Sequence, residues 1–439
     1  MHTSTVTHAF AYRRYTLPFR TPVRTAHGVW TQREGLLVRL ESEDGKITFG
    51  ECAPLPWFGT ETVDEAAAVC AALGACVSDG QLDAIGEKYP CLGFALNERV
   101  SAHQLGDDAV LCGTGDPPVD GARRRQYARV SLPTPRASHP CHSTPHGRVA
   151  KAARPVQSGA LPVAALLPAG RAAFEKIPAL AEAGFRAFKW KVGASCPAEA
   201  ADELALLGDV LAALPAGALL RLDANGAWTR RTAERWLARC ADYRDNIEFV
   251  EQPVACDPRD TRDTRDTRRG EDLLLGLAGD YPTPLALDES IATAAAIDRW
   301  LRLNWPGIFV IKPSLLGCAR ETLEKLPPDR TVFSSALETI VGAQAALRMA
   351  FRFYTAGEER RFATAGRGEA SQKNESAVAR FARPADTIRR SDSPSPRALG
   401  FGVRPLFTDA RFDAPPAAPF IRAADLDTIN SETPWNALN

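Results

Sequence analysis

The sequence lacks several features that would point to particular classes of protein. Acidic and basic residues balance at 53 each, so no excess charge favours nucleic acid or an anionic membrane surface as a partner. No apolar run reaches the ~18–20 residues that a membrane-spanning helix requires. The first residues lack the apolar core of a secretory signal peptide. We therefore expect a cytoplasmic protein that binds neither membrane nor nucleic acid, and the sequence sets no oligomeric state.

The sequence also lacks closely spaced cysteine pairs, and its second half lacks histidine. The 10 cysteines include no C-x-x-C pair, so neither a zinc site nor a disulfide framework follows from their spacing, and we expect reduced thiols. All 7 histidines occur at or before His146. The remainder of the chain, which carries the regular pattern described below, therefore has no histidine to serve as a catalytic base or a metal ligand.

Composition divides the chain into ordered and biased stretches. Residues 1–105 predict a small α+β domain, with strands over 8–52 and an Ala-rich helix over 63–76. Residues 106–157 are rich in Gly, Pro, Ser, Arg and His and predict a disordered basic insertion, with a tether for an anionic partner as the alternative. Two more biased stretches, at about 256–272 and 357–395, predict exposed loop insertions.

Between residues 158 and 403, short apolar runs alternate with Ala/Leu/Arg-rich helical stretches. The runs are LPVAALLPAG (161–170), FRAFKWKVG (185–193), LLRLDANG (219–226), IEFVEQPV (247–254), PLALDES (284–290), GIFVIKPSL (307–315), TVFSSALE (331–338) and ALGFGV (398–403). Buried strands alternating with helices indicate βαβ units and a parallel sheet. This number of units favours a closed barrel over an open sheet, so the predicted fold is an α/β protein with a (β/α)7β TIM-like barrel.

Charged residues recur where these predicted strands end. They are Lys189, Lys191, Asp223, Glu251, Asp288 and Lys312. Active sites of β/α barrels lie at the carboxyl ends of the strands, so we expect these side chains to meet. Three converging carboxylates repel one another unless a cation lies among them. Mg²⁺ prefers such oxygen ligands, and the set predicts a divalent metal site.

The lysines have a role beside such a metal. Lys189 and Lys191 lie two residues apart and therefore face the same side of their strand. A lysine near another ammonium and a metal has a lowered pKa and can act as a base near neutral pH. With Lys312 on the opposite side, the pattern predicts abstraction of a proton next to a carboxylate, with metal stabilisation of the resulting enediolate.

These strand-end motifs, K-x-K, D-x-N, E-Q-P, D-E-S and K-P, resemble those of the muconate-lactonizing subgroup of the enolase superfamily. The resemblance covers residues 1–105 and the predicted barrel. It implies that Asp223, Glu251 and Asp288 are the metal ligands. It also implies that Lys191 and Lys312 form the acid/base pair, with Lys189 supporting Lys191. Residues 1–105 would then be a capping domain, completed by the C-terminal segment 404–439.

Further stretches are similar to those of the o-succinylbenzoate synthase family. They are PFRTPVRTAHGVW, GECAPLPWFGTET, LLPAG, RLDANGAW, LALDES, IKPSLLG and SSALETIVG. This resemblance implies a small carboxylate substrate, a cyclohexadiene bearing hydroxyl and succinyl groups, from the menaquinone pathway. Lys191 would remove the proton and return it to the departing hydroxide in a syn elimination. Candidate substrate contacts are Arg221, Asn225, Ser334 and Ser335.

The capping domain predicts how the site is covered. We expect loops near Arg20–Arg24 and Pro54–Thr60 to close over the barrel mouth, with Trp57 and Phe58 excluding water. The alternative for these aromatic residues is the domain interface.

The same lysine pair also suits other reactions. N-succinylamino acid racemases, dipeptide epimerases and cycloisomerases of the superfamily remain open alternatives. The absence of an acidic pair in ALGFGVRPLFTD lowers the dipeptide epimerase option. A catalytically inactive interaction protein is the alternative from a different class, and loss of metal binding would distinguish it.

Overall fold

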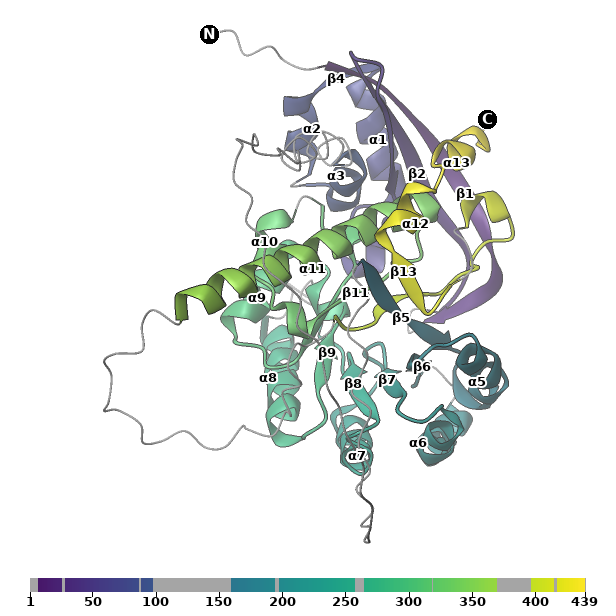
Figure 1. Cartoon of the computed structure of the whole chain (residues 1–439), viewed down its shortest axis with the longest axis vertical. Helices are drawn as coiled ribbons and strands as arrows, with labels where there is room; N and C mark the ends of the chain where they lie inside the picture. The colour runs from purple at the N-terminus through teal and green to yellow at the C-terminus, as the bar shows by residue number, and fades with distance from the viewer. Residues whose placement is uncertain are drawn as a thin grey trace, which may run out of the picture.

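The described chain consists of a capping unit and a barrel (Figure 1). The computed structural model describes residues 7–25, 28–86, 88–97, 159–193, 197–256, 264–317, 319–368, 396–413 and 417–438. In Figure 1 the purple N-terminal sheet lies above the teal and green barrel, and the yellow C-terminal segment lies beside that sheet. No helix among the described residues is long and apolar enough to span a membrane.

The capping unit is an antiparallel sheet covered by three short helices. Its strands are β1 (Thr7–Thr25), β2 (Gly28–Ser42), β3 (Ile47–Cys52) and β4 (Cys76–Ser78), in the order β3-β2-β1-β4. The helices are α1 (Val63–Leu73), α2 (Asp79–Ile85) and α3 (Pro90–Leu96). Capping boxes at Thr62 with Glu65 and at Ser78 with Gln81 begin α1 and α2, because each pair satisfies backbone N–H groups that a helix start leaves free.

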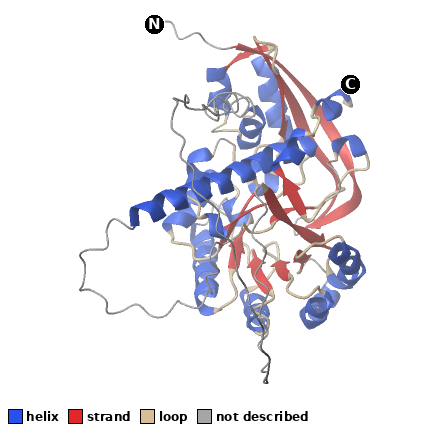
Figure 2. Ribbon diagram, in the orientation of Figure 1, coloured by secondary structure: helices blue, strands red, loops and turns tan. Residues whose placement is uncertain are grey.

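Eight parallel strands form the barrel, as the alternating pattern predicts (Figure 2). They are β5 (Ala160–Leu167), β6 (Ala187–Lys191), β7 (Leu219–Asp223), β8 (Ile247–Glu251), β9 (Leu285–Leu287), β10 (Ile308–Ile311), β11 (Thr331–Phe333) and β12 (Leu399–Gly402). The sheet order is β11-β10-β9-β8-β7-β6-β5-β12, and a parallel bridge between Ser334 and Gly400 joins its two ends. The ring is therefore nearly closed.

Helices surround this ring and alternate with its strands. They are α5 (Ala173–Glu182), α6 (Pro197–Ala213), α7 (Arg230–Ala241), α8 (Thr264–Asp280), α9 (Ala294–Arg302), α10 (Arg320–Glu324) and α11 (Ile340–Gly368). The order, with seven strand–helix pairs and a final strand, confirms the predicted (β/α)7β architecture.

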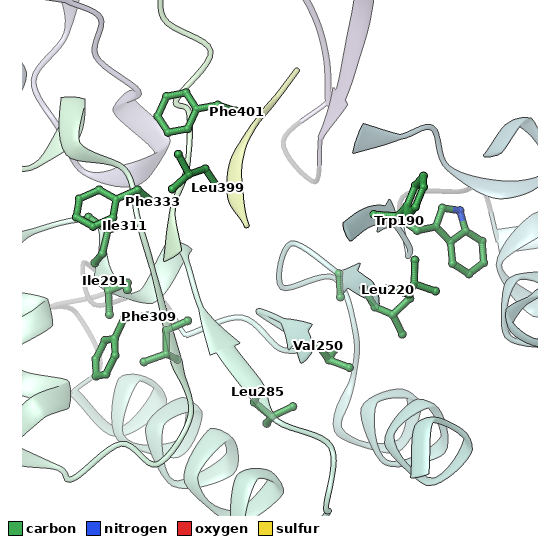
Figure 3. Close-up of a cluster of buried hydrophobic side chains, with 14 of the residues drawn as sticks. Trp190, Leu220, Val250, Leu285, Ile291, Phe309, Ile311, Phe333, Leu399 and Phe401 are labelled. Carbon is green, nitrogen blue, oxygen red and sulfur yellow. The ribbon is translucent and has the colours of Figure 1, made fainter. Parts of the chain in front are cut away.

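Successive strand residues serve two different cores. Leu220, Val250 and Phe309 belong to the large cluster between strands and helices, part of which Figure 3 shows. Their alternating neighbours form a separate small cluster: Phe249, Ala286, Ile308, Val310 and Val332. Because strand side chains alternate with a period of two, the small cluster fills the barrel interior.

A β-bulge brings a buried ion cluster into the barrel. Leu220 pairs with Ile247 but Arg221 pairs with Phe249, so Glu248 is an extra residue on β8. Its carboxylate accepts from Arg221 Nε at 2.7 Å and from Arg397 Nη1 at 2.8 Å. Burial alone would raise the pKa of Glu248, but the two guanidinium groups lower it below its ordinary value. The cluster lies toward the strands' amino ends, away from the predicted active site.

Glu248→Gln should lower the free energy of unfolding by about 3–5 kcal/mol, because it leaves two arginines without their counter-charge, one of them fully buried. Urea unfolding followed by circular dichroism measures this change. Glu234→Gln is the matched control, because it breaks an exposed pair with Arg230 that is worth roughly 0.3–0.5 kcal/mol. Equal shifts of the two midpoints would contradict the stabilising role of the cluster.

The C-terminal segment contacts the capping sheet at several points. It contains β13 (Phe420–Arg422), α12 (Ala423–Asp427) and α13 (Glu432–Asn436). Phe407 forms an antiparallel bridge with Phe19 of β1. Arg13 of β1 donates to the Trp435 carbonyl oxygen at 2.6 Å and its guanidinium stacks on the Trp435 ring at 4.3 Å. The last residues of the chain thus pack on the first strand.

Three predicted loops are partly regular structure. The loop prediction for residues 256–272 is wrong from Thr264 onward, where α8 begins. Burial of Leu274 and Leu277 stabilises this helix, and its charged first turns extend it at little cost because helix growth is cooperative. The loop prediction for 357–395 is wrong as far as Gly368, where α11 ends. This helix contains the buried residues Phe353 and Tyr354 and extends beyond them. Residues 20–24 belong to β1 and not to a loop.

The predicted basic insertion at 106–157 lies outside the described residues, as do 257–263 and 369–395.

Candidate active site

The predicted strand-end residues come together at one end of the barrel. Lys191, Asp223 and Glu251 are the last residues of β6, β7 and β8 and are aligned across the sheet, Lys191 with Asp223 and Asp223 with Glu251. Asp288 follows β9 and Lys312 follows β10. Asp223, Glu251 and Asp288 are almost fully buried, with 2%, 1% and 4% of each residue exposed. Parallel pairing without a register change over these positions explains why the five motifs converge.

Two lysines pair directly with the three carboxylates. Lys189 Nζ lies between two of them, 2.8 Å from Asp223 Oδ2 and 2.7 Å from Glu251 Oε1. Lys312 Nζ pairs with Asp288 Oδ1. Burial disfavours the charged form of Lys189, but the three carboxylates outweigh it and raise its pKa. Lysines therefore supply the positive charge of the site in this arrangement.

The charge balance of the site fits an additional cation. Among the described residues, no three His, Cys, Asp or Glu side chains form a ready metal-binding group. Burial, followed by the charges of Asp223 and Asp288, nevertheless raises the pKa of Glu251 to about 8. Burial and Asp288 likewise raise the pKa of Glu289 to about 7. Carboxylates whose ionisation is this costly, with oxygen donors only, suit a hard divalent ion such as Mg²⁺.

Asn225 connects a predicted base to a predicted metal ligand. Its Oδ1 accepts from Lys191 Nζ at 3.2 Å, and its backbone N–H donates to Asp223 Oδ1 at 3.1 Å. Its φ of 45° lies in the left-handed region, which asparagine tolerates better than most residues. The D-x-N spacing therefore has a local structural reason: the turn at Asn225 brings this residue back toward Asp223 at the end of β7.

Gln252 is a site residue to which the sequence pattern assigned no role. Its buried side chain accepts from the backbone N–H groups of Asp288 and Ser290 and donates to Ser290 Oγ at 2.7 Å. It thereby fixes the end of β9 against the end of β8. Gln252 and Ser290 stand in the E-Q-P and D-E-S motifs of the sequence, but only the structure shows that they bind each other.

Three predicted substrate contacts have other partners here. Arg221 binds Glu248 and stacks on Phe249 at 4.8 Å, below the carboxylates. Ser334 Oγ donates weakly to the Gly400 carbonyl oxygen at 3.4 Å, and Ser335 Oγ accepts from Leu337 N–H at 2.9 Å. The two serines lie at the end of β11, on the same edge of the barrel as the lysines.

The capping unit reaches the site through Phe58. Lys312 Nζ lies 4.7 Å from the centre of the Phe58 ring, whereas Trp57 packs edge-on against Trp30 at 5.0 Å. Phe58 ends the short 3-10 helix η1 (Pro56–Phe58), which Gly59 terminates with a φ of 85°. Phe58 is thus in contact with a predicted catalytic group.

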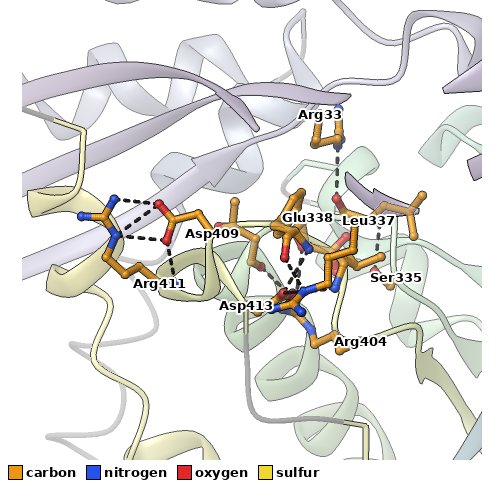
Figure 4. A network of polar contacts seen from close by, with 12 residues as sticks. Arg33, Ser335, Leu337, Glu338, Arg404, Asp409, Arg411 and Asp413 are labelled. Atoms are coloured by element: carbon orange, nitrogen blue, oxygen red, sulfur yellow. Dashed lines mark hydrogen bonds and ion pairs between the residues drawn. The ribbon is translucent and has the colours of Figure 1, made fainter. Parts of the chain in front are cut away.

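Arg33 joins the Phe58 loop to the barrel, and Figure 4 shows its contact with Leu337. Its buried guanidinium donates to the carbonyl oxygens of Ala53 and Pro54 in the capping unit, and to that of Leu337 after β11. Leu337 has a φ of 62°, an unfavourable backbone conformation for a branched residue. One side chain therefore anchors both the capping loop and the loop that follows the two serines.

Glu51 provides a second link between the units. Its carboxylate accepts from Tyr15 Oη at 2.5 Å, from Thr339 N–H at 2.9 Å and from Gly342 N–H at 2.8 Å. The last two N–H groups belong to the start of α11, where a buried carboxylate also benefits from the helix dipole. The cap is consequently held on the barrel by buried polar contacts as well as by apolar packing.

Comparison with known proteins agrees with this geometry. Residues 7–101 match the "MenC, N-terminal domain" family and residues 173–325 match "Enolase C-terminal domain-like". The o-succinylbenzoate synthase of Thermosynechococcus vestitus is 36% identical over 342 residues, which cover 76% of this chain and 86% of the relative. The chain belongs to the o-succinylbenzoate synthase family of the enolase superfamily.

Other relatives and solved structures place the family in context. The crystal structure of o-succinylbenzoate synthase from Thermosynechococcus elongatus, complexed with Mg in its active site, has a TM-score of 0.63 at 30% identity and covers 98% of this chain and 99% of its own. A hydrophobic dipeptide epimerase of Roseobacter litoralis is 27% identical, covering 75% of this chain and 81% of the relative. The dipeptide epimerase of Cytophaga hutchinsonii, with a TM-score of 0.54 at 18% identity, shares the fold.

Phe58→Leu should lower kcat/KM of this family member by roughly 2- to 30-fold, the range that a cation–π contact supplies, because Lys312 loses the ring that covers it. Steady-state kinetics on purified variants measure the change. Phe420→Leu is the control, because it removes an exposed ring, at 57% exposure, from β13. Equal kinetics for Phe58→Leu and the wild type would show that the contact with Lys312 plays no part in turnover.

Proposed function

We propose that this protein is an o-succinylbenzoate synthase, which dehydrates a succinyl-hydroxycyclohexadiene-carboxylate to o-succinylbenzoate with the aid of Mg²⁺. One observation carries the proposal: a relative that is 36% identical over most of both chains has this activity in its name. The lysine and carboxylate arrangement at the barrel mouth is chemically suited to such a reaction. As family members of this type do, it would act in menaquinone biosynthesis, in the cytoplasm, where the 6 described free cysteines would stay reduced.

In the proposed mechanism, Asp223, Glu251 and Asp288 would hold the metal. Mg²⁺, when bound, would act as a Lewis acid that stabilises negative charge developing on the substrate carboxylate. Three strand ends supply these ligands, and Gln252 fixes the β9 end relative to the β8 end. The ligand set thus rests on rigid elements of the barrel and not on flexible loops.

The proton transfers fall to Lys191. Lys191 removes the proton from the carbon next to the carboxylate, and the resulting ammonium then protonates the hydroxyl group that leaves from the same face. One C–H and one C–O bond break, a C=C bond forms, and water departs, which makes the ring aromatic. Lys189 supports this step electrostatically from the same strand face, 2.8 Å from Asp223.

Lys312 acts from the opposite side of the bound substrate. Its ammonium faces the site under the Phe58 ring and stabilises the planar, electron-rich ring formed after proton removal. The main chain and hydroxyl groups at Ser334 and Ser335, together with Asn225, supply polar contacts for the substrate carboxylates. Arg221 binds Glu248 in the barrel interior and would therefore affect the substrate only indirectly.

Racemisation or epimerisation is the second candidate, because two lysines on opposite faces also suit a two-base reaction. A relative named as a dipeptide epimerase, at 27% identity, favours including it. The acidic residues that follow β12 have partners within the chain, which argues against a site for a substrate amine. Asp413 accepts from the backbone N–H groups of Leu406 and Phe407, and Asp409 pairs with Arg411 at 2.7 Å.

A substrate panel tests the proposal. Purified protein with Mg²⁺ is assayed by absorbance with the cyclohexadiene substrate, and by polarimetry with N-succinylamino acids and hydrophobic dipeptides. Dehydration with kcat/KM at least about 10-fold above that for every other substrate supports the synthase. Racemisation without dehydration would replace it by the second candidate. Turnover of no substrate, with no Mg²⁺ binding, would favour an interaction protein.

A further inference from the structure

A hydrogen-bonded chain runs from the predicted base Lys191 to a carboxylate with no role in the mechanism above. Lys191 Nζ donates to Asn225 Oδ1 at 3.2 Å, and Asn225 Nδ2 donates to Glu289 Oε1 at 3.0 Å. The other carboxylate oxygen, Glu289 Oε2, is buried and has no hydrogen-bond partner among the described residues. Glu289 is therefore held in the site with one of its two oxygens committed to Asn225.

The two hydrogen bonds that join Lys191, Asn225 and Glu289 have one consistent direction of donation. An asparagine amide donates from Nδ2 and accepts at Oδ1. The ammonium form of Lys191 can only donate, and the amine form must donate to Asn225 if its lone pair is to face the substrate proton. Glu289 Oε1 accepts from Nδ2 whether the carboxyl is ionised or carries its proton on Oε2. The amide is therefore fixed with Oδ1 toward Lys191. Without an acceptor at residue 289, the amide is free to turn and offer Nδ2 to Lys191. The amide N–H would then repel the ammonium form, or occupy the lone pair that the amine form needs for the substrate proton.

We propose that Glu289 is a positioning residue that orients the Asn225 amide and thereby holds the Lys191 amine in the direction of the substrate proton. The inference deepens the proposed function and rests on it for the identity of the substrate. It assigns Asn225 to the alignment of the base, in addition to any contact with substrate. Because Asn225 also binds Asp223 through its backbone N–H, the same residue sets the spacing between the base and a metal ligand.

Glu289→Met and Glu289→Gln form a matched pair for the test. Methionine fills a similar volume but offers no comparable acceptor, so kcat should fall about 10- to 100-fold, the cost of misplacing a catalytic group by an ångström, with KM changed less than about 3-fold. Glutamine keeps an oxygen facing Asn225 Nδ2 and should retain kcat within about 3-fold. Mg²⁺ affinity, measured by calorimetry, should change equally in the two variants, because both remove the charge of Glu289 and both leave Asp223, Glu251 and Asp288 intact.

A double-mutant cycle separates orientation from a general structural effect. Asn225→Gly keeps the left-handed backbone without strain and removes the amide. If Glu289 acts through Asn225, Glu289→Met should lower kcat less than about 2-fold further in the Asn225→Gly background. Additive losses, an equal loss for Glu289→Gln, or a loss confined to Mg²⁺ affinity would each overturn the proposal.

Crystal structures of the two Glu289 variants test directly whether Glu289 orients Asn225, and this test does not depend on which reaction the protein catalyses. The Lys191–Asn225 contact should persist in Glu289→Gln and be lost in Glu289→Met. Persistence in both variants would overturn the inference. A wild-type protein that fails to dehydrate the cyclohexadiene substrate would instead overturn the proposed function, and the structural result would still stand.

Discussion

Lys191→Met is expected to lower kcat by roughly 10²–10⁴-fold, the contribution of a general base, while leaving fold and metal binding intact. Methionine has about the length of lysine without its amine, so packing at the end of β6 is preserved. Lys191 is the proposed proton acceptor. Its Nζ contacts Asn225 but, unlike Lys189, it has no carboxylate of the described residues within ion-pair distance. Stopped-assay kinetics with Mg²⁺ at saturation, together with calorimetric Mg²⁺ titration, measure both parts of the expectation.

Lys176→Met serves as the control for this substitution, because Lys176 is exposed on α5 and is not a strand-end residue. It should leave kcat unchanged. Lys191→Met with more than about a tenth of wild-type kcat would remove Lys191 from the role of base. Loss of Mg²⁺ binding in the same variant would make it a structural residue of the metal site.

Glu251→Gln should weaken Mg²⁺ binding by more than the roughly 10- to 100-fold that follows loss of a hydrogen-bond partner of a metal ligand, because a ligand itself is changed. Burial and the neighbouring carboxylates already raise the pKa of Glu251 to about 8. Near neutral pH, deprotonation of this group must therefore accompany metal binding. Mg²⁺ affinity should rise as pH increases from about 6 to 9, since the metal competes with a proton for the Glu251 carboxylate.

Calorimetry over this pH range measures both effects, and the gain in thermal midpoint on adding Mg²⁺ provides an independent readout. The gain should be large in the wild type and in Glu234→Gln, whose altered side chain pairs with Arg230 on the surface of α7. It should be small in Glu251→Gln. Unchanged affinity in Glu251→Gln would exclude this residue from the ligand set.

The sequence was sufficient to predict the barrel and its charged strand ends. Strand alternation and apolar runs determine which face of β6 to β10 meets the helices, and short loops determine where each strand ends. Because parallel strands align their carboxyl ends, residues such as Lys191, Asp223 and Glu251 had to converge once the barrel closed. Membership of the family was predictable for the same reason, since its motifs occupy these positions.

The remaining features depend on contacts between distant segments. Arg221 lies two residues before Asp223 and therefore on the same face of β7. Its partner Glu248 is the extra residue of a bulge that no local sequence pattern predicts. The start of α8 carries a repeat with loop-like composition. It is helical because the helix extends cooperatively from the turns in which Leu274 and Leu277 are buried. The Gln252 and Glu289 contacts join motifs some 36 and 64 residues apart in the chain, so their partners follow from the barrel register.

The measurement that tests the central claim most directly is the dehydration assay on wild-type protein before and after removal of divalent metal. The proposal predicts rapid aromatisation of the cyclohexadiene substrate with Mg²⁺, loss of activity with EDTA, and recovery when Mg²⁺ is added in excess. Dehydration that persists at full rate after metal removal would contradict the assignment of Asp223, Glu251 and Asp288 as the ligands of an essential cation.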